Sequence, residues 1–159
     1  MKKKQKLSHY DEAGSARMVD VSAKASTKRT ARAHAFLKIR PAVLKQLPDN
    51  PKGNPLEVAR LAGVMAAKKT SELIPLCHPL PLSYADVEIT VEKKGVRIVA
   101  TASTSAQTGV EMEALTAAGV AALTVYDMTK ALDKGIEITD LYLLEKTGGK
   151  SGDFRRGNK

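Results

Sequence analysis

The stretch Val87-Glu-Ile-Thr-Val-Glu-Lys-Lys-Gly-Val-Arg-Ile-Val-Ala-Thr-Ala102 contains two runs in which every second residue is apolar. A period of two places those apolar side chains on one face of a β-strand. The Lys-Lys-Gly sequence that separates the runs is typical of a turn. The stretch therefore predicts an antiparallel hairpin with one apolar face, which other parts of the chain must cover.

A helix with a well-defined start is expected upstream of this hairpin. Asn54 can cap the helix, Pro55 suits its first position, and Glu57 lies three residues after the cap. The helix should continue to about Lys69. Leu56, Ala59, Gly63 and Ala66 lie on one face of it. The small residues of this face let a neighbouring element approach closely.

A second helix is expected downstream, from about Glu111 to Leu132, where Gly135 follows as a stop signal. Alternating patterns predict two further strands, over Thr30–Ile39 and over Ile136–Leu144. Pro41 suits the first turn of a short helix, Pro41–Leu47. The segment Leu73–Leu82 contains three prolines and is expected to be extended rather than helical.

The expected order of elements is strand, two helices, hairpin, helix and strand. This order predicts an α+β sandwich with a mainly antiparallel sheet and helices packed on one face. The ferredoxin-like topology is the nearest common arrangement. We expect one catalytic domain over residues 17–147, a flexible N-terminal arm over residues 1–16, and a flexible tail rich in Gly and Lys over residues 148–159.

The composition excludes several classes of protein. The 159 residues suffice for one domain, and 43% apolar with 27% charged residues is the balance of an ordinary globular protein. A single cysteine rules out an internal disulfide framework and favours the reducing cytoplasm. Because no run of about 18 apolar residues occurs, we expect no transmembrane helix.

The formal net charge of +9 is distributed unevenly along the chain. Between Lys24 and Lys69 there are eleven basic residues and two acidic ones, whereas Thr70–Glu145 has eleven acidic and five basic residues. The two halves either form a site for a polyanion beside acid–base groups or are simply two solvated faces. A nucleic-acid-binding module is the alternative, but four tyrosines, two phenylalanines and no stacking motif speak against it.

Two motifs with apparent chemistry lead to no firm site on their own. Gly148-Gly-Lys-Ser-Gly152 fails the P-loop pattern because Leu144 stands where a glycine is required. It is either a flexible phosphate clamp or a plain chain end. Cys77 and His78 are adjacent, so on an extended segment they should face opposite sides and not share a metal ion. His78 is either a site residue or a core histidine, and no metal-ligand spacing occurs in the sequence.

Acid–base candidates lie at both ends of the second predicted helix. Asp127 and Lys130 are three residues apart and share a face, as a surface ion pair or as an acid–base pair. Glu111 and Glu113 begin the helix, where the helix dipole favours carboxylates. Fourteen residues separate Glu113 from Asp127, which is about 21 Å along a continuous helix. A site that uses both residues needs either two subunits or a broken helix.

Eight blocks of this sequence, taken together, closely resemble the MoaC family, the cyclic pyranopterin monophosphate synthases of molybdenum cofactor biosynthesis. The resemblance extends from about Leu7 to Phe154. The blocks are Met18-Val-Asp-Val-Ser22, Lys52-Gly53, Ala59-Arg-Leu-Ala-Gly63, Ala67-Lys68, Leu73-Ile-Pro-Leu-Cys-His-Pro-Leu80, Gly109-Val-Glu-Met-Glu-Ala-Leu-Thr116, Tyr126-Asp-Met-Thr-Lys-Ala131 and Gly148-Gly-Lys-Ser-Gly152.

The resemblance implies that the chain converts a cyclised dihydro-GTP into cyclic pyranopterin monophosphate and diphosphate. It implies Asp127 and Lys130 as the catalytic pair. The substrate-binding residues that it implies are Leu76, Cys77, His78, Glu111, Met112, Glu113, Lys52, Lys68 and Lys146. A non-catalytic nucleotide-binding subunit of the same fold is the remaining alternative.

The family further implies a ferredoxin-like subunit in a hexamer, built as a trimer of dimers, with active sites at the subunit interfaces. We expect no tightly bound cofactor and no protein-bound metal. Mg²⁺ is expected only as a companion of the substrate triphosphate. We expect a cytoplasmic enzyme with a small-molecule substrate and with neither nucleic acid nor membrane as a partner.

Overall fold

The computed structural model describes residues 9–157, and its central feature is the hairpin that the alternating sequence predicts. β2 (Leu82–Glu92) and β3 (Gly95–Ala106) are antiparallel and joined by two lysines. Val87 faces Ala100 and Ile89 faces Ile98 across the two strands. Residues 1–8 of the predicted arm and residues 158–159 of the predicted tail lie outside the described residues.

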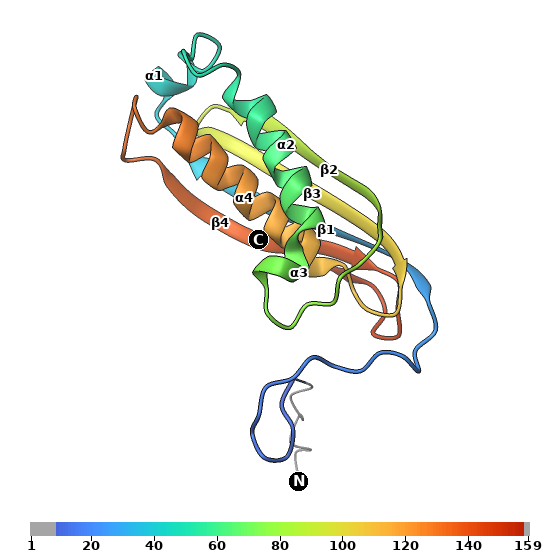
Figure 1. The fold of residues 1–159 in the computed structure, drawn as a ribbon. Helices are drawn as coiled ribbons and strands as arrows, with labels where there is room; N and C mark the ends of the chain where they lie inside the picture. Colours follow the sequence, from blue (N-terminus) through green and yellow to red (C-terminus); the bar gives the residue numbers. More distant parts are fainter. Residues whose placement is uncertain (1–8, 158–159) are drawn as a thin grey trace.

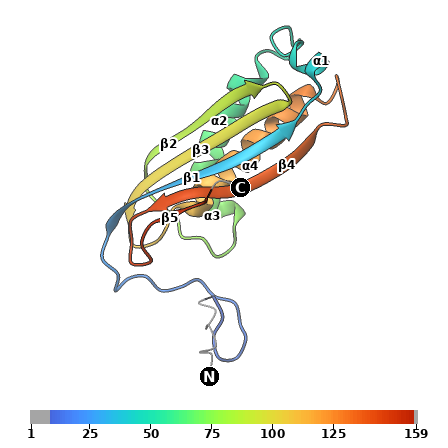
Figure 2. The same ribbon diagram turned by 180° about the vertical axis from the view of Figure 1, so that it is seen from behind.

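The hairpin belongs to one five-stranded antiparallel sheet with the strand order β2-β3-β1-β4-β5. β1 (Thr27–Lys38) lies between β3 and β4 (Glu137–Thr147). The first four strands and the two long helices have the ferredoxin-like connection, so the predicted α+β fold is confirmed. Figure 2 shows the sheet from the side that the long helices leave uncovered.

Two helices, α2 (Pro55–Lys68) and α4 (Glu111–Thr129), lie side by side on the other face of the sheet (Figure 1). The predicted cap of α2 is present, because Asn54 Oδ1 accepts hydrogen bonds from the backbone N–H groups of Leu56 at 3.0 Å and Glu57 at 3.3 Å. Among the described residues, no helix has both the length and the apolar character needed to cross a membrane.

Several element boundaries differ from the sequence-based expectations. β1 begins at Thr27, three residues earlier than expected. α1 (Pro41–Leu44) is shorter than expected, because the chain continues as turns. α4 ends at Thr129 instead of Leu132, since the N–H of Leu132 turns back to the Thr129 carbonyl at 2.9 Å.

The prediction of an extended segment from Leu73 onward is wrong at its start. Leu73 ends a short helix, α3 (Thr70–Leu73), and the Cys77 N–H closes a turn on the Ile74 carbonyl at 3.1 Å. The sequence also gave no sign of β5 (Phe154–Arg155), which pairs with the end of β4.

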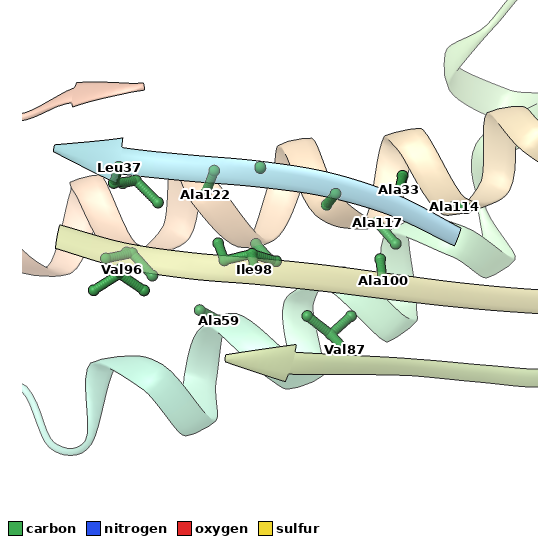
Figure 3. Packing of buried hydrophobic residues seen from close by; sticks show 14 of the residues in the cluster. Ala33, Leu37, Ala59, Val87, Val96, Ile98, Ala100, Ala114, Ala117 and Ala122 are labelled. Carbon is green, nitrogen blue, oxygen red and sulfur yellow. The ribbon is translucent and has the colours of Figure 1, made fainter. Parts of the chain in front are cut away.

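The core between sheet and helices is built largely from alanine, as Figure 3 shows. Small side chains on both layers let the helix axes lie close to the sheet. Gly63 of α2 lies in one such close contact, where an added Cβ would be 2.8 Å from the Ala117 carbonyl oxygen of α4 and 2.8 Å from Val87 Cγ2 of β2. The fully buried residues labelled in Figure 3 include Ala33, Leu37, Ala59, Val96, Ile98, Ala100, Ala114 and Ala122.

We predict that Gly63→Ala destabilises the protein, whereas the same change at Gly119 does not. At Gly63 the new methyl group overpacks a backbone contact, which should lower the free energy of unfolding by about 1–3 kcal/mol. At Gly119 of α4 the nearest atom to an added Cβ is Leu141 Cδ2 at 3.5 Å, so alanine should be neutral or stabilising by up to about 1 kcal/mol. Chemical denaturation of both variants checks this, and equal effects would contradict the close approach of α2 and α4.

Candidate active site

A cleft of about 1030 Å³ lies where several chain segments meet at the start of α4. The N-terminal segment Val19–Thr27 forms one wall and the segment Leu76–Leu80 after α3 forms another. The loop Gln107–Gly109 and the first turn of α4 form the floor, while the end of β4 and the tail close the remaining side. In Figure 1 the N-terminal segment and α3 lie at this same end of the sheet.

Seven of the eleven site residues expected from the sequence line this cleft, although they come from three separate parts of the chain. Cys77 and His78 both contribute, despite being neighbours. The seven residues are Leu76, Cys77, His78, Glu111, Met112, Glu113 and Lys146.

His78 connects two walls of the cleft. Its Nε2 atom lies 2.7 Å from the carbonyl oxygen of Val19. A carbonyl oxygen only accepts hydrogen bonds, so Nε2 carries a proton in this contact. The histidine therefore holds the N-terminal segment against the Leu76–Leu80 wall and is not a core histidine.

Glu113 contributes a buried carboxyl group to the cleft. Its side chain is only 4% exposed, and burial raises the pKa of its carboxyl group, with a further increase from the charge of nearby Glu111. Burial also raises the pKa of the Cys77 thiol, and the negative charge of Glu113 acts in the same direction. A raised pKa makes a carboxyl group a better proton carrier than an exposed carboxylate, which suits general acid–base catalysis.

Four basic side chains surround the same space. Lys146 Nζ lies 3.2 Å from Glu111 Oε1 and donates to Ser151 Oγ at 2.8 Å. Arg29 is held by the carbonyl oxygens of Ala106 and Gln107, at 3.1 and 3.3 Å. Lys24 and Lys150 also line the cleft. Several cations around one opening suit a ligand with several negative charges.

Of these basic residues, only Lys146 belonged to the expected site. The excess of basic residues between Lys24 and Lys69 was a signal for Lys24 and Arg29, but a count of charges does not say which side chains share a space. The sequence indicates Lys150 and Ser151 only as parts of a possible phosphate clamp, and it singles out neither as a site residue. A serine in a glycine-rich stretch has no pattern that distinguishes it from a linker residue.

The remaining expected site residues lie outside the cleft. Lys68 is exposed near the end of α2. Asp127 and Lys130 form an exposed ion pair at the end of α4, with Lys130 Nζ donating to Asp127 Oδ1 at 2.6 Å. This hydrogen bond lowers the pKa of the Asp127 carboxyl, to which the positive charge of Lys52 also contributes, and it raises the pKa of Lys130.

The helix between the two groups of residues is unbroken. α4 runs without interruption from Glu111 to Thr129, so the 14 residues from Glu113 to Asp127 extend over about 21 Å. The loop that carries Lys52 is tied to the far end, since Asn50 Nδ2 donates to the Met128 carbonyl at 2.9 Å. Within one chain, the cleft and the Asp127–Lys130 pair therefore lie at opposite ends of α4. Within residues 9–157, no three His, Cys, Asp or Glu side chains are arranged to hold a metal ion.

Comparisons with known proteins give a consistent result over almost the whole chain. Residues 18–149 match the model of the MoaC family. A protein of Parvibaculum lavamentivorans, named cyclic pyranopterin monophosphate synthase, is 54% identical over 154 residues, which are 94% of this chain and 96% of that protein. Proteins of the same name from Streptomyces avermitilis and a Nostoc species are 56% and 57% identical, over 95% and 93% of this chain and 90% of each relative.

We predict that Glu113→Gln raises stability in a pH-dependent way. Burial raises the pKa of Glu113 in the folded protein. The protein therefore has its full stability below the pKa that Glu113 has in the unfolded chain, and it loses stability as the pH rises through the pKa of the folded state. Glutamine removes that loss. Thermal unfolding should therefore show a higher midpoint for the variant at pH 8 and a much smaller difference at pH 4. A difference that is the same at both pH values would contradict a raised pKa.

Proposed function

The chain belongs to the MoaC family, and we propose that its cleft is where it acts as a cyclic pyranopterin monophosphate synthase of molybdenum cofactor biosynthesis. The substrate would be a cyclised dihydro-GTP, and the products cyclic pyranopterin monophosphate and diphosphate. The observation that carries this proposal is the combination of four basic side chains with one buried carboxyl group in a single cleft. The composition of the cleft suits a triphosphate that must also undergo proton transfers.

The basic residues would stabilise the departure of diphosphate. A hydroxyl group of the substrate attacks the α-phosphorus, and the bond from that phosphorus to the bridging oxygen breaks. Negative charge develops on the leaving diphosphate, where Lys146, Arg29 and Lys150 can neutralise it. The attacking hydroxyl gives up one proton, for which a carboxylate of the site is the natural acceptor.

The ring rearrangement needs groups that exchange protons near neutral pH. Glu113, with its raised pKa, would hold a proton next to the substrate. Asp127 would be the second acid–base group, kept ionised and oriented by Lys130. Leu76 and Met112 supply apolar walls, and His78 holds the N-terminal segment over the substrate.

A complete site of this kind requires two copies of the chain, because the unbroken α4 keeps Glu113 and Asp127 about 21 Å apart. We propose a homo-oligomer, a hexamer arranged as a trimer of dimers, in which Asp127, Lys130 and Lys52 of one copy approach the cleft of another. Exposed apolar side chains on the long helices support such contacts. They are Val58, Leu61 and Met65 on α2 and Leu123 on α4, each 43–59% exposed.

The cellular setting follows from the chemistry. We propose a cytoplasmic enzyme, because its substrate derives from GTP and its single cysteine favours a reducing compartment. Mg²⁺, where it takes part, would be carried by the triphosphate rather than by a protein site. The comparisons favour the synthase over a nucleic-acid-binding module, and turnover separates the synthase from a non-catalytic nucleotide-binding subunit.

We predict that Glu113→Gln and Asp127→Asn each abolish most turnover but complement each other when mixed. If each site takes its cleft from one copy and its Asp127 from another, random reassembly of equal amounts restores about a quarter of the sites. Release of diphosphate from cyclised dihydro-GTP, measured after joint unfolding and refolding of the two variants, checks this. Mixed samples that stay inactive would contradict a site shared between copies.

The matched control is a mixture that cannot complement. Glu113→Gln refolded together with Lys146→Met should show no more activity than the two variants refolded separately, because both changes affect the same cleft and no new combination of copies restores it. A gain of activity in this mixture would show that restoration does not depend on where the two residues lie. Wild-type protein without any turnover would contradict the proposed function itself.

A further inference from the structure

The tail after β4 folds back as a hairpin loop against the cleft. Lys146 pairs with Phe154 and Glu145 with Arg155, so residues 148–153 form the loop between β4 and β5. Glu145 strengthens this pairing by binding the Arg155 guanidinium at 3.1 Å. The Gly148 N–H donates to Asp153 Oδ1 at 3.0 Å across the loop. These contacts give the loop a defined path toward the cleft.

Glycines allow the loop to lie directly on β1. Gly148 and Gly149 have φ values of +85° and +83°, which other residues rarely adopt. An added Cβ at Gly148 would collide with the Lys28 carbonyl oxygen, and one at Gly149 would collide with the Arg29 guanidinium. The glycine pair therefore serves a close approach rather than general flexibility. It brings the next two residues, Lys150 and Ser151, to the wall of the cleft.

Ser151 contacts Lys146, whose ammonium group lies between the loop and α4. Lys146 Nζ donates to Ser151 Oγ at 2.8 Å on one side and pairs with Glu111 Oε1 at 3.2 Å on the other. Without the serine, the flexible lysine side chain would be drawn toward the carboxylate alone. The two contacts together keep the ammonium group at the opening between α4 and the tail.

We propose that Ser151 is a positioning residue, which holds the Lys146 ammonium group ready for the polyphosphate part of an anionic ligand in the cleft. Ser151 acts through Lys146 and not by direct chemistry. When a phosphate oxygen replaces Glu111 as the partner of the ammonium group, the bond to Ser151 keeps Nζ in place. The inference rests on the proposed function, because it takes the triphosphate of the substrate as the ligand.

A double-mutant cycle with inorganic triphosphate tests this role. Calorimetric titration gives the Kd for wild type, Ser151→Ala, Lys146→Met and the double variant. We expect Ser151→Ala to weaken binding about fivefold, in line with the net loss of one typical hydrogen bond. Lys146→Met should weaken it about tenfold or more, and adding Ser151→Ala to Lys146→Met should change Kd less than about twofold.

Two further variants separate positioning from a structural effect. Ser151→Thr keeps the hydroxyl group and should bind within about twofold of wild type. Ser83→Ala, in β2 and outside the cleft, should bind like wild type. The proposal is overturned if Ser151→Ala has no effect, if its effect is undiminished in the Lys146→Met protein, or if wild type does not bind triphosphate.

Turnover of cyclised dihydro-GTP by the same proteins keeps the two claims apart. If the wild-type protein turns over cyclised dihydro-GTP but the Kd for triphosphate does not depend on Ser151, the role of Ser151 is contradicted and the proposed function is not. Absence of wild-type turnover would sink the proposed function, while the triphosphate titrations would still decide whether Ser151 acts through Lys146.

Discussion

The straightness of α4 governs how this molecule can do chemistry. The helix of 19 residues lies on the sheet through a face of alanines, so its position is set by close packing rather than by a few large side chains. One end of the helix supplies Glu111, Met112 and Glu113 to the cleft, and the other end carries Asp127 beside Lys130. A rigid element that bears reactive groups at both ends distributes them between different sites or different subunits.

The cleft end of α4 combines two electrostatic features that usually exclude each other. Glu113 is buried and its pKa is raised, which favours a neutral, proton-holding carboxyl. Basic side chains lie around the same cavity, but Arg29 is engaged with backbone carbonyls and Lys146 with Glu111 and Ser151. These partners hold the cations at the edge of the cavity. A polyanion could thus bind at the edge while proton transfer takes place beside the buried carboxyl.

Sequence patterns predicted the parts of the fold that depend on local periodicity. The hairpin, the capped start of α2 and the ferredoxin-like order all follow from alternation, capping residues and proline positions. β5 could not be predicted, because two residues that pair with β4 have no period of their own. The turn at Ile74–Cys77 was missed for a similar reason, since nearby prolines exclude a helix but do not specify where an extended segment begins.

The candidate site was predictable in its residues more than in its shape. Family resemblance pointed to Glu113, Lys146 and Asp127, and the spacing along one helix already required that Glu113 and Asp127 not share a site within one chain. Lys24, Arg29 and Ser151 were missed as members of the cleft. Their place depends on contacts that bring the N-terminal segment and β1 together with the folded-back tail. The tail is far from both in the sequence, so these contacts leave no local pattern.

A crystal structure of the assembled protein with its nucleotide substrate bound would test the central claim most directly. We expect triphosphate density in the cleft beside Lys146, with the purine-derived ring near Glu113 of one copy and Asp127 of a neighbouring copy. A nucleotide bound elsewhere, or one that meets Glu113 and Asp127 of the same copy, would contradict it.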